Sequence, residues 1–205
     1  MGDLQKLHWE KVYETKKSKE VSWTQPVPQI SLNFIHSYHL PKTASIIDVG
    51  GGDSNLVDHL LDEGFTNLTV LDISARALDN AKQRLGARAE KVNWIVSDIT
   101  FFEPATSYDV WHDRAAFHFL TTKEQVEKYI KVAERSIKGY MIIATFSEVG
   151  PEKCSGLDVQ QYSDEKLETI FNNRFLKLHC ITEDHITPFN TTQNFLFCSF
   201  KKRNI

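Results

Sequence analysis

The decapeptide IIDVGGGDSN places three consecutive glycines and an acidic side chain directly after an apolar run. Gly50, Gly51 and Gly52 would let the backbone approach a ligand closely, because glycine lacks a side chain and adopts turn conformations freely. A dinucleotide fingerprint requires a further glycine three residues later, and a phosphate-binding loop requires a lysine; the chain has neither. Asp48 would repel a pyrophosphate and attract a cation. The loop therefore predicts a site for a positively charged ligand without phosphate.

Two further acids follow apolar runs that read as strands. Asp72 lies in TVLDIS, twenty residues after the last glycine of the loop, and Asp98 lies in WIVSDIT. An acid at the first place can accept hydrogen bonds from both hydroxyls of a ribose. Asp98 could accept from an adenine amino group, with Ile73 and Ile99 on the two faces of the ring. Because the carboxyl ends of parallel strands meet at one edge of a sheet, the acids together favour a nucleoside site over separate strand-end turns.

S-adenosylmethionine suits this set, since it carries a sulfonium and an ammonium and no phosphate. At these residues the sequence resembles class I S-adenosylmethionine-dependent methyltransferases: DVGGGDS matches their acidic-x-Gly-x-Gly-x-Gly loop, with Ser54 in place of the last glycine. The strong part of the resemblance covers about residues 40–146. It implies an α/β fold with a Rossmann-like, doubly wound, seven-stranded sheet that is mostly parallel, has an antiparallel last strand and carries helices on both faces. It also implies methyl transfer with S-adenosylmethionine as cofactor.

A narrower resemblance rests on HWEKVYE near the N-terminus, VWHDRAAFHFL, and ATFSEVGPEKCSGL. These segments are similar to a bacterial branch of type 11/12 methyltransferase domains, which is distantly similar to the methyltransferase-like protein lysine methyltransferases. The latter carry an Asp-Lys-Gly motif where this chain has Asp113, Arg114 and Ala115. Because the Lys-Gly part is missing, a protein substrate does not carry over to this chain.

The segment after the fourth expected strand supplies the catalytic candidates. His112 and Asp113 are expected at the methionine end of the cofactor, where either could touch the sulfonium side or act as a base if the acceptor arrives protonated. His118, Tyr162 and His185 are expected to face the acceptor from three loops. The alternative is that all of these side chains cap loops and fill the core.

Aromatic side chains near the N-terminus predict a lid. Trp9, Tyr13 and Trp23 could close over the cofactor, since aromatic faces attract a sulfonium as they do other cations. They could equally pack onto the edge of the sheet, and the sequence predicts no regular element before Pro28 to bury them.

The elements that must position these residues alternate between short β-rich runs and longer helical patterns, which is typical of parallel βαβ units. The C-terminal part instead predicts a helix followed by an antiparallel hairpin at the sheet edge. The expected strands are 45–49, 68–71, 92–96, 108–111, 140–146, 175–182 and 193–200, and the expected helices are 28–38, 54–63, 74–85, 122–135 and 163–171. We expect one domain over residues 1–205, with a lid and helix (1–40), a cofactor-binding core (41–146), and a substrate loop and hairpin (147–205).

The composition limits which partners and which cellular location we expect for this protein. The formal net charge is −3 and the cations are scattered, which argues against nucleic acid or an anionic membrane as partner. No run approaches the length of a membrane span, and the polar N-terminus lacks an apolar signal core. Cys154, Cys180 and Cys198 are odd in number and lack paired spacing, so we expect reduced thiols and a cytoplasmic protein. No His or Cys spacing predicts a metal site, and oligomeric state stays open.

The functional hypothesis is therefore a methyltransferase that acts on an unidentified acceptor, with a small molecule favoured. Protein lysine methylation and a non-catalytic S-adenosylmethionine-binding module remain as alternatives. A nicotinamide-dependent oxidoreductase is the third class, and Asp48 together with the missing glycine counts against it.

Overall fold

The computed structural model describes residues 2–17 and 20–203, and it contains one seven-stranded sheet. The strands lie in the order β3-β2-β1-β4-β5-β9-β8; β1 to β5 run parallel, while β9 runs antiparallel to both of its neighbours. The predicted mostly parallel sheet with an antiparallel last strand is confirmed. The reversal of strand order between β1 and β4 is the place where open α/β sheets bind ligands.

The elements agree with the predicted ranges within a few residues for most of the chain. Among the predicted elements, the largest differences are at strands β4, β5, β8 and β9, each of which is longer than predicted. The strands are β1 (Ser45–Val49), β2 (Asn67–Asp72), β3 (Val92–Val96), β4 (Tyr108–Arg114), β5 (Ile137–Phe146), β6 (Lys153–Cys154), β7 (Leu157–Asp158), β8 (Phe175–Ile186) and β9 (Thr192–Lys202). The helices are α1 (Gly2–Thr15), α2 (Gln29–Ser37), α3 (Leu56–Asp62), α4 (Ala75–Leu85), α5 (Lys123–Ser136) and α6 (Asp164–Phe171), with short 3-10 turns η2 (Gly86–Lys91), η3 (Ile99–Phe101) and η4 (Phe117–Phe119).

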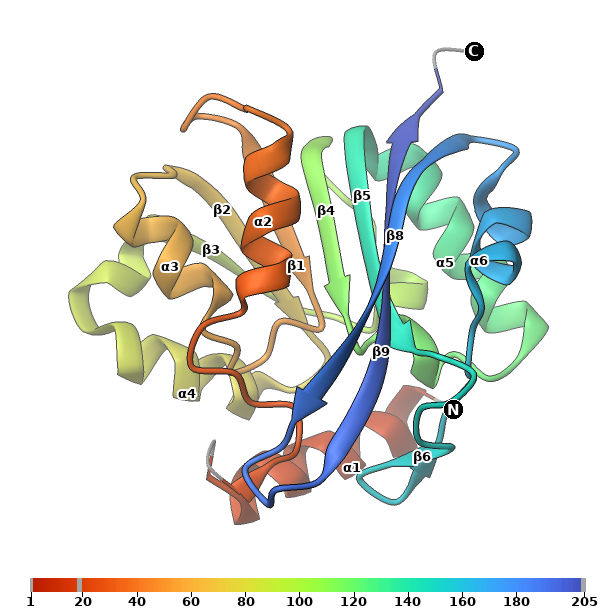
Figure 1. Cartoon of the computed structure of the whole chain (residues 1–205). Helices are drawn as coiled ribbons and strands as arrows, with labels where there is room; N and C mark the ends of the chain where they lie inside the picture. The colour runs from red at the N-terminus through yellow and green to blue at the C-terminus, as the bar shows by residue number, and fades with distance from the viewer. Residues whose placement is uncertain (1, 18–19, 204–205) are drawn as a thin grey trace.

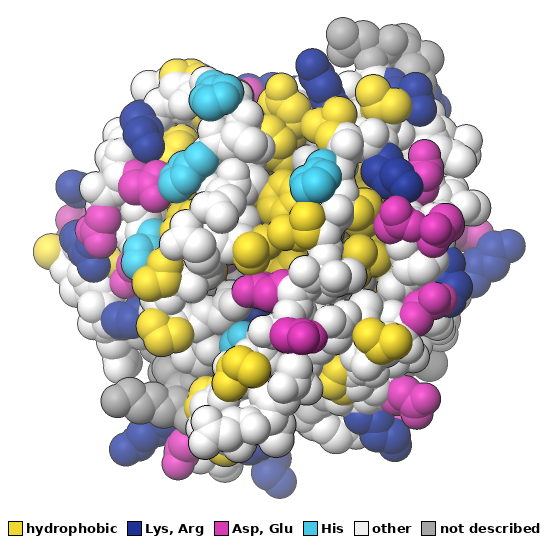
Figure 2. Space-filling model, viewed as in Figure 1, with side chains coloured by type: hydrophobic (Ala, Val, Ile, Leu, Met, Phe, Trp, Pro, Cys, Tyr) yellow, Lys and Arg dark blue, Asp and Glu magenta, His cyan; other side chains and the backbone are white. Residues whose placement is uncertain are grey.

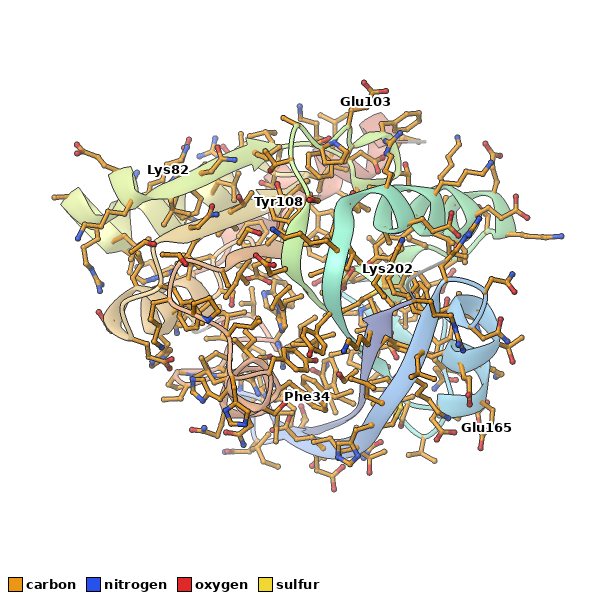
Figure 3. All side chains as sticks on the ribbon, turned by 90° about the horizontal axis from the view of Figure 1, so that it is seen from above. Phe34, Lys82, Glu103, Tyr108, Glu165 and Lys202 are labelled. Atoms are coloured by element: carbon orange, nitrogen blue, oxygen red, sulfur yellow. A yellow bond between two sulfur atoms is a disulfide. The ribbon has the colours of Figure 1, made fainter. Side chains whose placement is uncertain are left out.

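Two apolar layers cover the two faces of the sheet. One joins α5 and α6 to the sheet and includes Trp111 and Tyr129; the other joins α2, α3 and α4 to the sheet and includes Ile46 and Val110. Seen from above, α2, which carries Phe34, and α5 lie on opposite sides of the sheet (Figure 3). Successive strand residues point to opposite faces, so residues separated by an even number of positions share a face. A side chain at a strand end can therefore be assigned to one layer by counting from these core residues.

Local signals explain where the helices begin. Ser74, Thr122 and Ser163 each accept a hydrogen bond from a backbone amide two or three residues into the helix that follows. Such caps satisfy amides that have no partner inside the helix. Thr122 also forms a reciprocal capping box with Gln125.

The N-terminal segment forms helix α1, which the sequence did not predict. In Figure 1 this helix lies across the end of the sheet at which the parallel strands finish. Its Glu10 carboxylate accepts hydrogen bonds from the amides of Ala75, at 2.7 Å, and Arg76, at 3.3 Å, at the start of α4. Leu4 and Leu7 of the helix are exposed, whereas Val12 is buried. The position of the helix therefore depends on tertiary contacts that its local sequence does not reveal.

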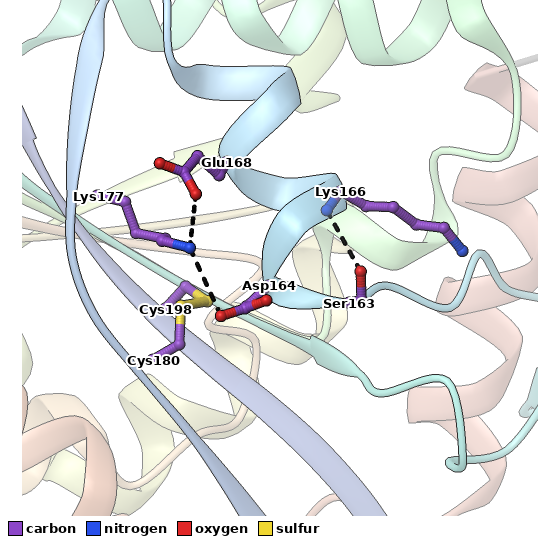
Figure 4. The surroundings of a disulfide bond; sticks show 7 residues. All are labelled: Ser163, Asp164, Lys166, Glu168, Lys177, Cys180 and Cys198. Carbon is purple, nitrogen blue, oxygen red and sulfur yellow. Dashed lines mark hydrogen bonds and ion pairs between the residues drawn. A yellow bond between two sulfur atoms is a disulfide. The ribbon is translucent and has the colours of Figure 1, made fainter.

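The C-terminal hairpin of β8 and β9 carries a disulfide between Cys180 and Cys198 (Figure 4). The expectation of three reduced thiols was wrong for this pair. Their spacing of 18 residues gives no local signal, and only the hairpin register places the two residues directly opposite each other. Beside the bond, Lys177 of β8 forms ion pairs with Asp164 and Glu168 of α6.

On the face shown in Figure 2, apolar side chains gather in a band between α2 and β8, with charged side chains around them. Tyr38, at the C-terminal end of α2, stacks on Tyr140 of β5 with ring centroids 4.0 Å apart. Among the described residues, no helix is both long and apolar enough to cross a membrane.

Candidate functional site

The larger of the two cavities described here lies at the carboxyl ends of the strands and is covered by α1. Its lining divides into two parts according to the strands that supply it. The β1–β3 half is lined by Gly50, Leu71, Asp72, Ile73, Ser97, Asp98 and Ile99, and the β4–β9 half by Arg114, Phe119, Phe146, Cys154, Gln193 and Phe195. Gln5, Trp9, Tyr13 and Trp23 form the roof.

The glycine loop is held against the second strand. The amides of Gly50 and Gly51 donate to the carbonyl of Leu71 at 2.7 and 3.2 Å. Gly50 and Gly52 have φ angles of +65° and +45°, which favour glycine. A Cβ on Gly51 would lie 2.7 Å from a carboxylate oxygen of Asp48, so no larger residue fits there. The three glycines therefore let the loop pack closely against β2 and Asp48, and close approach to a ligand stays a prediction.

Asp72 lines the β1–β3 half with a carboxylate that is almost fully buried. One oxygen accepts from the amide of Ser74 at 2.8 Å. Burial raises the pKa of Asp72 to about 7, and the charges of Asp48 and Glu10 add to this effect. Its other oxygen lies near the loop, since a Cβ on Gly52 would be 3.1 Å from it.

Asp98 and the two isoleucines lie in the same half, as the sequence predicted. One Asp98 oxygen accepts from the amide and the hydroxyl of Thr100, at 2.8 and 2.7 Å. The carboxylate thereby caps η3. Ile73 and Ile99 supply apolar walls beside the two acids.

Asp48 forms a buried chain with His112 and Ser31. The Nδ1 atom of His112 lies 2.7 Å from an Asp48 oxygen, and Nε2 lies 2.8 Å from the Ser31 hydroxyl. Because a carboxylate only accepts, Nδ1 carries the hydrogen, and in the neutral ring Nε2 accepts from Ser31. All three side chains are buried. They line a smaller cavity that also borders Gly50 and Gly51. His112 thus ties α2 to the first and fourth strands beside the glycine loop.

Asp113 does not line either cavity in the described part of the chain, which differs from the expectation of a base there. Asp113 lies two residues after Trp111 on β4, so its side chain points to the same face of the sheet, which α5 covers. There it is fully buried and accepts hydrogen bonds from the amides of Ala116 and Phe117 and from the Tyr129 hydroxyl. Burial raises the pKa of Asp113 to about 6, although these three donors oppose the shift.

The three residues expected to face the acceptor are also buried outside the cavity lining. His118 accepts from the amide of Phe146 at 3.2 Å, and burial lowers its pKa to about 3. His185 lies 2.7 Å from the carbonyl of Ser22. Tyr162 packs on Phe117 within the core. In each case backbone and core contacts fix the side chain, which is the alternative that the sequence had left open.

The aromatic roof brings Trp9, Tyr13 and Trp23 together over the cavity. Trp9 makes edge contacts with Trp23 and with Phe119, at centroid distances of 5.7 and 5.0 Å. Tyr13 lies 6.2 Å from Trp23 and against the glycine loop. Burial raises the pKa of Tyr13, and the charge of Asp72 adds to this effect.

Sequence reasoning missed Arg114, which lines both cavities. The expected fourth strand stopped at Trp111, whereas the strand continues to Arg114. Counting parity from Val110 would have put His112 and Arg114 on one face and Asp113 on the other. Among residues 2–17 and 20–203, no group of three or more His, Cys, Asp or Glu side chains is arranged to hold a metal ion.

Comparison with known proteins places this site in context. Residues 47–138 match a family model described as a methyltransferase domain. The chain is 26% identical over 131 residues to the eEF1A lysine and N-terminal methyltransferase of Bos taurus, in a match that covers 63% of this chain and 18% of that protein. It is 32% identical over 113 residues to the malonyl-[acyl-carrier protein] O-methyltransferase of Anoxybacillus flavithermus, covering 54% of this chain and 41% of that protein. The matches thus span less than half the length of these relatives.

Solved structures share the fold over nearly the whole chain. A methyltransferase dependent on S-adenosylmethionine from Anabaena variabilis superposes with a TM-score of 0.76 at 14% identity, covering 98% of this chain and 95% of that one. The N-methyltransferase NodS of Bradyrhizobium japonicum, in complex with S-adenosylhomocysteine, superposes with a TM-score of 0.67 at 16% identity, covering 95% of this chain and 98% of that one. The resemblance to class I methyltransferases that the sequence predicted is confirmed by the family match and the fold.

Proposed function

We infer that this chain, whose residues 47–138 match the methyltransferase domain family, is a methyltransferase that uses S-adenosylmethionine. The observation that carries this inference is the β1–β3 half of the cavity. There a glycine loop, the Asp72 carboxylate and the Asp98 carboxylate meet at the reversal of strand order. An adenosine that carries positive charge fits this set, since none of the described residues that line this half is a lysine or arginine able to hold a phosphate.

The residues have distinct roles in holding the cofactor. Asp72 would accept from the ribose hydroxyls and Asp98 from the adenine amino group, with Ile73 and Ile99 beside the ring. Asp48 lies behind Gly51, where its charge favours the ammonium and sulfonium groups. The Asp48–His112 bond fixes the direction of that carboxylate. His112 therefore acts as a positioning residue for the loop.

The cofactor would supply an activated methyl group on a sulfonium sulfur. The chain contributes alignment of the acceptor and exclusion of water, which are the main sources of rate in such transfers. The roof of Trp9, Tyr13 and Trp23 serves the second purpose. Among the described residues that line the β4–β9 half, the titratable groups are Arg114 and Cys154, and burial raises the pKa of the Cys154 thiol to about 11. This half thus offers no base at neutral pH, so the attacking atom of the acceptor must arrive with a free lone pair.

The acceptor is a small molecule in our proposal. The β4–β9 half lies beneath the roof and between aromatic side chains, and no acidic side chain among its described lining residues is available to receive a lysine ammonium. Lysine methylation of a protein is the second candidate, favoured by the similarity to the eEF1A lysine and N-terminal methyltransferase. A binding module without catalysis is the third.

One assay separates these candidates. The purified protein is incubated with S-adenosylmethionine labelled in the methyl group and a cell extract, which is then divided into small molecules and proteins. We expect label in the small-molecule fraction. Label in the protein fraction alone would support the lysine methyltransferase. Calorimetric binding of S-adenosylhomocysteine without any transfer would support the binding module, and binding of NAD in its place would refute the assignment.

A further inference from the structure

Arg114 carries two hydrogen-bond donors that have no partner in the described part of the chain. Its Nη1 atom donates to the carbonyl of Trp23 at 2.9 Å. The Nε and Nη2 atoms are buried and make no hydrogen bond. Nε and Nη2 form one edge of the planar guanidinium, the edge that pairs with both oxygens of a carboxylate. Donors of a charged group are rarely left buried in this way, so the edge points to an anionic ligand.

The guanidinium of Arg114 lies beside an aromatic ring of β9. The Cζ atom lies 4.7 Å from the centroid of the Phe195 ring. Arg114 pairs with Ala144 of β5, and Phe195 of β9 pairs with Phe146 of β5. The side chain therefore extends from β4 across β5 toward β9. This direction leads into the β4–β9 half of the larger cavity, while the same side chain also borders the smaller cavity beside the glycine loop.

Arg114 provides the single positive charge among the described residues that line the larger cavity. Burial lowers its pKa to about 10, so it stays protonated at neutral pH. Asp48 and Glu183 act on it through space, but neither forms an ion pair with it in the part of the chain that the structure describes. Burial also lowers the pKa of His118 and of His185, and the charge of Arg114 contributes to both shifts. Glu183 keeps one buried carboxylate oxygen without a hydrogen-bond partner among the described residues, so the nearby charge of this acid limits the ligand at Arg114 to one negative charge.

The remaining walls define the rest of the ligand. Phe119, Phe146 and Phe195 line this half, and aromatic walls suit a flat apolar body. Gln193 adds one polar group: its Nε2 atom donates to the Ser22 hydroxyl at 3.3 Å, while its buried Oε1 atom has no partner among the described residues. A ligand here can therefore also donate one hydrogen bond.

We propose that the β4–β9 half binds the methyl acceptor as a flat organic acid, whose carboxylate receives paired hydrogen bonds from Nε and Nη2 of Arg114. This inference rests on the proposed methyltransferase function. A monoanionic carboxylate is favoured over a phosphate monoester, because a single guanidinium would leave most of a second charge uncompensated in a buried site.

The experiment measures binding of defined acids to the whole protein, with and without saturating S-adenosylhomocysteine. Benzoate and indole-3-acetate are compared with benzamide, indole-3-acetamide and phenyl phosphate by calorimetry or by ligand-observed NMR. We expect each acid to bind at least about tenfold more tightly than its amide, because the bonds to the acid are charge-assisted and paired. Arg114→Met should abolish this preference and leave the S-adenosylhomocysteine dissociation constant within about threefold of the wild type.

Two further variants control for folding and for charge. Arg174→Met removes an exposed arginine that lies outside both cavities and pairs with Glu134. This variant should change neither the dissociation constants of the acids nor that of S-adenosylhomocysteine. Arg114→Lys keeps the charge but loses the planar edge, so it should keep only part of the preference for acids. It also serves as the test if Arg114→Met does not fold, as judged by circular dichroism.

Several outcomes would overturn the proposal. They are equal affinity for acids and amides, no measurable binding of either acid, or tighter binding of phenyl phosphate than of benzoate. A tenfold loss of S-adenosylhomocysteine affinity in Arg114→Met would make Arg114 a cofactor ligand instead. These results differ from a failure of the proposed function, in which the wild-type protein binds no S-adenosylhomocysteine while the binding of acids can still be measured.

Discussion

At the scale of single residues, strand parity decides which polar side chains reach the site. His112 and Arg114 share the α2 face of β4 and line cavities, whereas Asp113 between them turns to Tyr129 on the other face. The three residues are adjacent in sequence and equally polar. A side chain's function here depends on the face that it occupies, because successive residues of a strand point in opposite directions.

Asp72 is expected to make cofactor binding depend on pH. Its pKa in the folded protein, about 7, lies above the value of about 4 for an exposed aspartate. Folding therefore favours the protonated form, and this contribution to stability is lost as the pH rises through 7. Ribose hydroxyls donate to the ionised form, so binding releases a proton below pH 7. The affinity for S-adenosylhomocysteine should rise from pH 6 to pH 8.

Calorimetry at several pH values tests this expectation, with Asp72→Asn as the matched variant. The variant should bind at least about tenfold more weakly, because each hydrogen bond to a charged group contributes roughly 1.5–3 kcal/mol. Its affinity should also no longer change with pH. An unchanged dissociation constant in Asp72→Asn would show that the carboxylate does not bind the ribose.

Asp113 is expected to stabilise the fold. Asp113→Ala leaves the amides of Ala116 and Phe117 and the Tyr129 hydroxyl without their acceptor. Each unsatisfied buried donor costs about 1–3 kcal/mol, so the free energy of unfolding should fall by roughly 3 kcal/mol or more. Urea denaturation measures this change, and Asp79→Ala, at an exposed ion pair with Lys82, is the control.

Asp113→Asn keeps an acceptor for the two amides and should retain both the fold and S-adenosylhomocysteine binding. If the variant folds and binds S-adenosylhomocysteine as expected but loses most of its turnover at saturating cofactor, Asp113 acts as the base that the sequence first suggested.

At the scale of elements, helix α1 connects the roof to the start of α4. The Glu10 carboxylate caps two amides there and also interacts favourably with the positive end of the α4 dipole. Trp9 and Tyr13 lie on the same helix, one residue before and three residues after Glu10. The helix that docks on α4 through Glu10 therefore also carries two of the side chains that cover the cavity.

Glu10→Ala is expected to loosen this docking by about 1–2 kcal/mol, the usual effect of losing a cap. Hydrogen exchange within residues 2–15 should become faster, and S-adenosylhomocysteine should bind more weakly. Glu14→Ala is the matched control on the same helix, because Glu14 is exposed and pairs with Arg76 at 3.5 Å. If cofactor slows exchange in α1 neither in the wild type nor in the variants, α1 is a fixed part of the fold and not a lid.

At the scale of the whole molecule, the hairpin of β8 and β9 closes the sheet next to the β4–β9 half. Phe195 and Gln193 of β9 line the cavity, and Cys198 of the same strand is bonded to Cys180. The β9 segment that lines the β4–β9 half is thus cross-linked to β8 at the sheet edge. This disulfide removes the thiol argument on which the predicted cytoplasmic location partly rested.

Thiol titration measures the state of this pair. Protein purified without reductant and unfolded in guanidinium should show one free thiol per chain, that of Cys154. Addition of reductant before titration should raise the number to three. Three thiols in the untreated protein would contradict the bond, and a Cys154→Ala variant, which should show none, is the control.

The sequence alone determined which polar residues and glycines stand at the strand ends of the β1–β3 half. Asp48, the glycines, Asp72 and Asp98 each follow directly from a local pattern, an apolar strand that ends in a turn, and parallel strands must bring such ends to one edge. Most helix and strand ranges follow from similarly local signals of periodicity and capping.

Only the tertiary structure decided which residues form the β4–β9 half of the cavity and how α1 covers it. Arg114 reaches Phe195 across β5, Glu10 docks α1 on α4, and Cys180 meets Cys198 through the register of a hairpin. Each of these contacts joins residues that lie far apart in sequence or on elements without a local signal. Their geometry depends on the packing of the whole chain, because side-chain direction and strand register are set by the layers on both faces of the sheet.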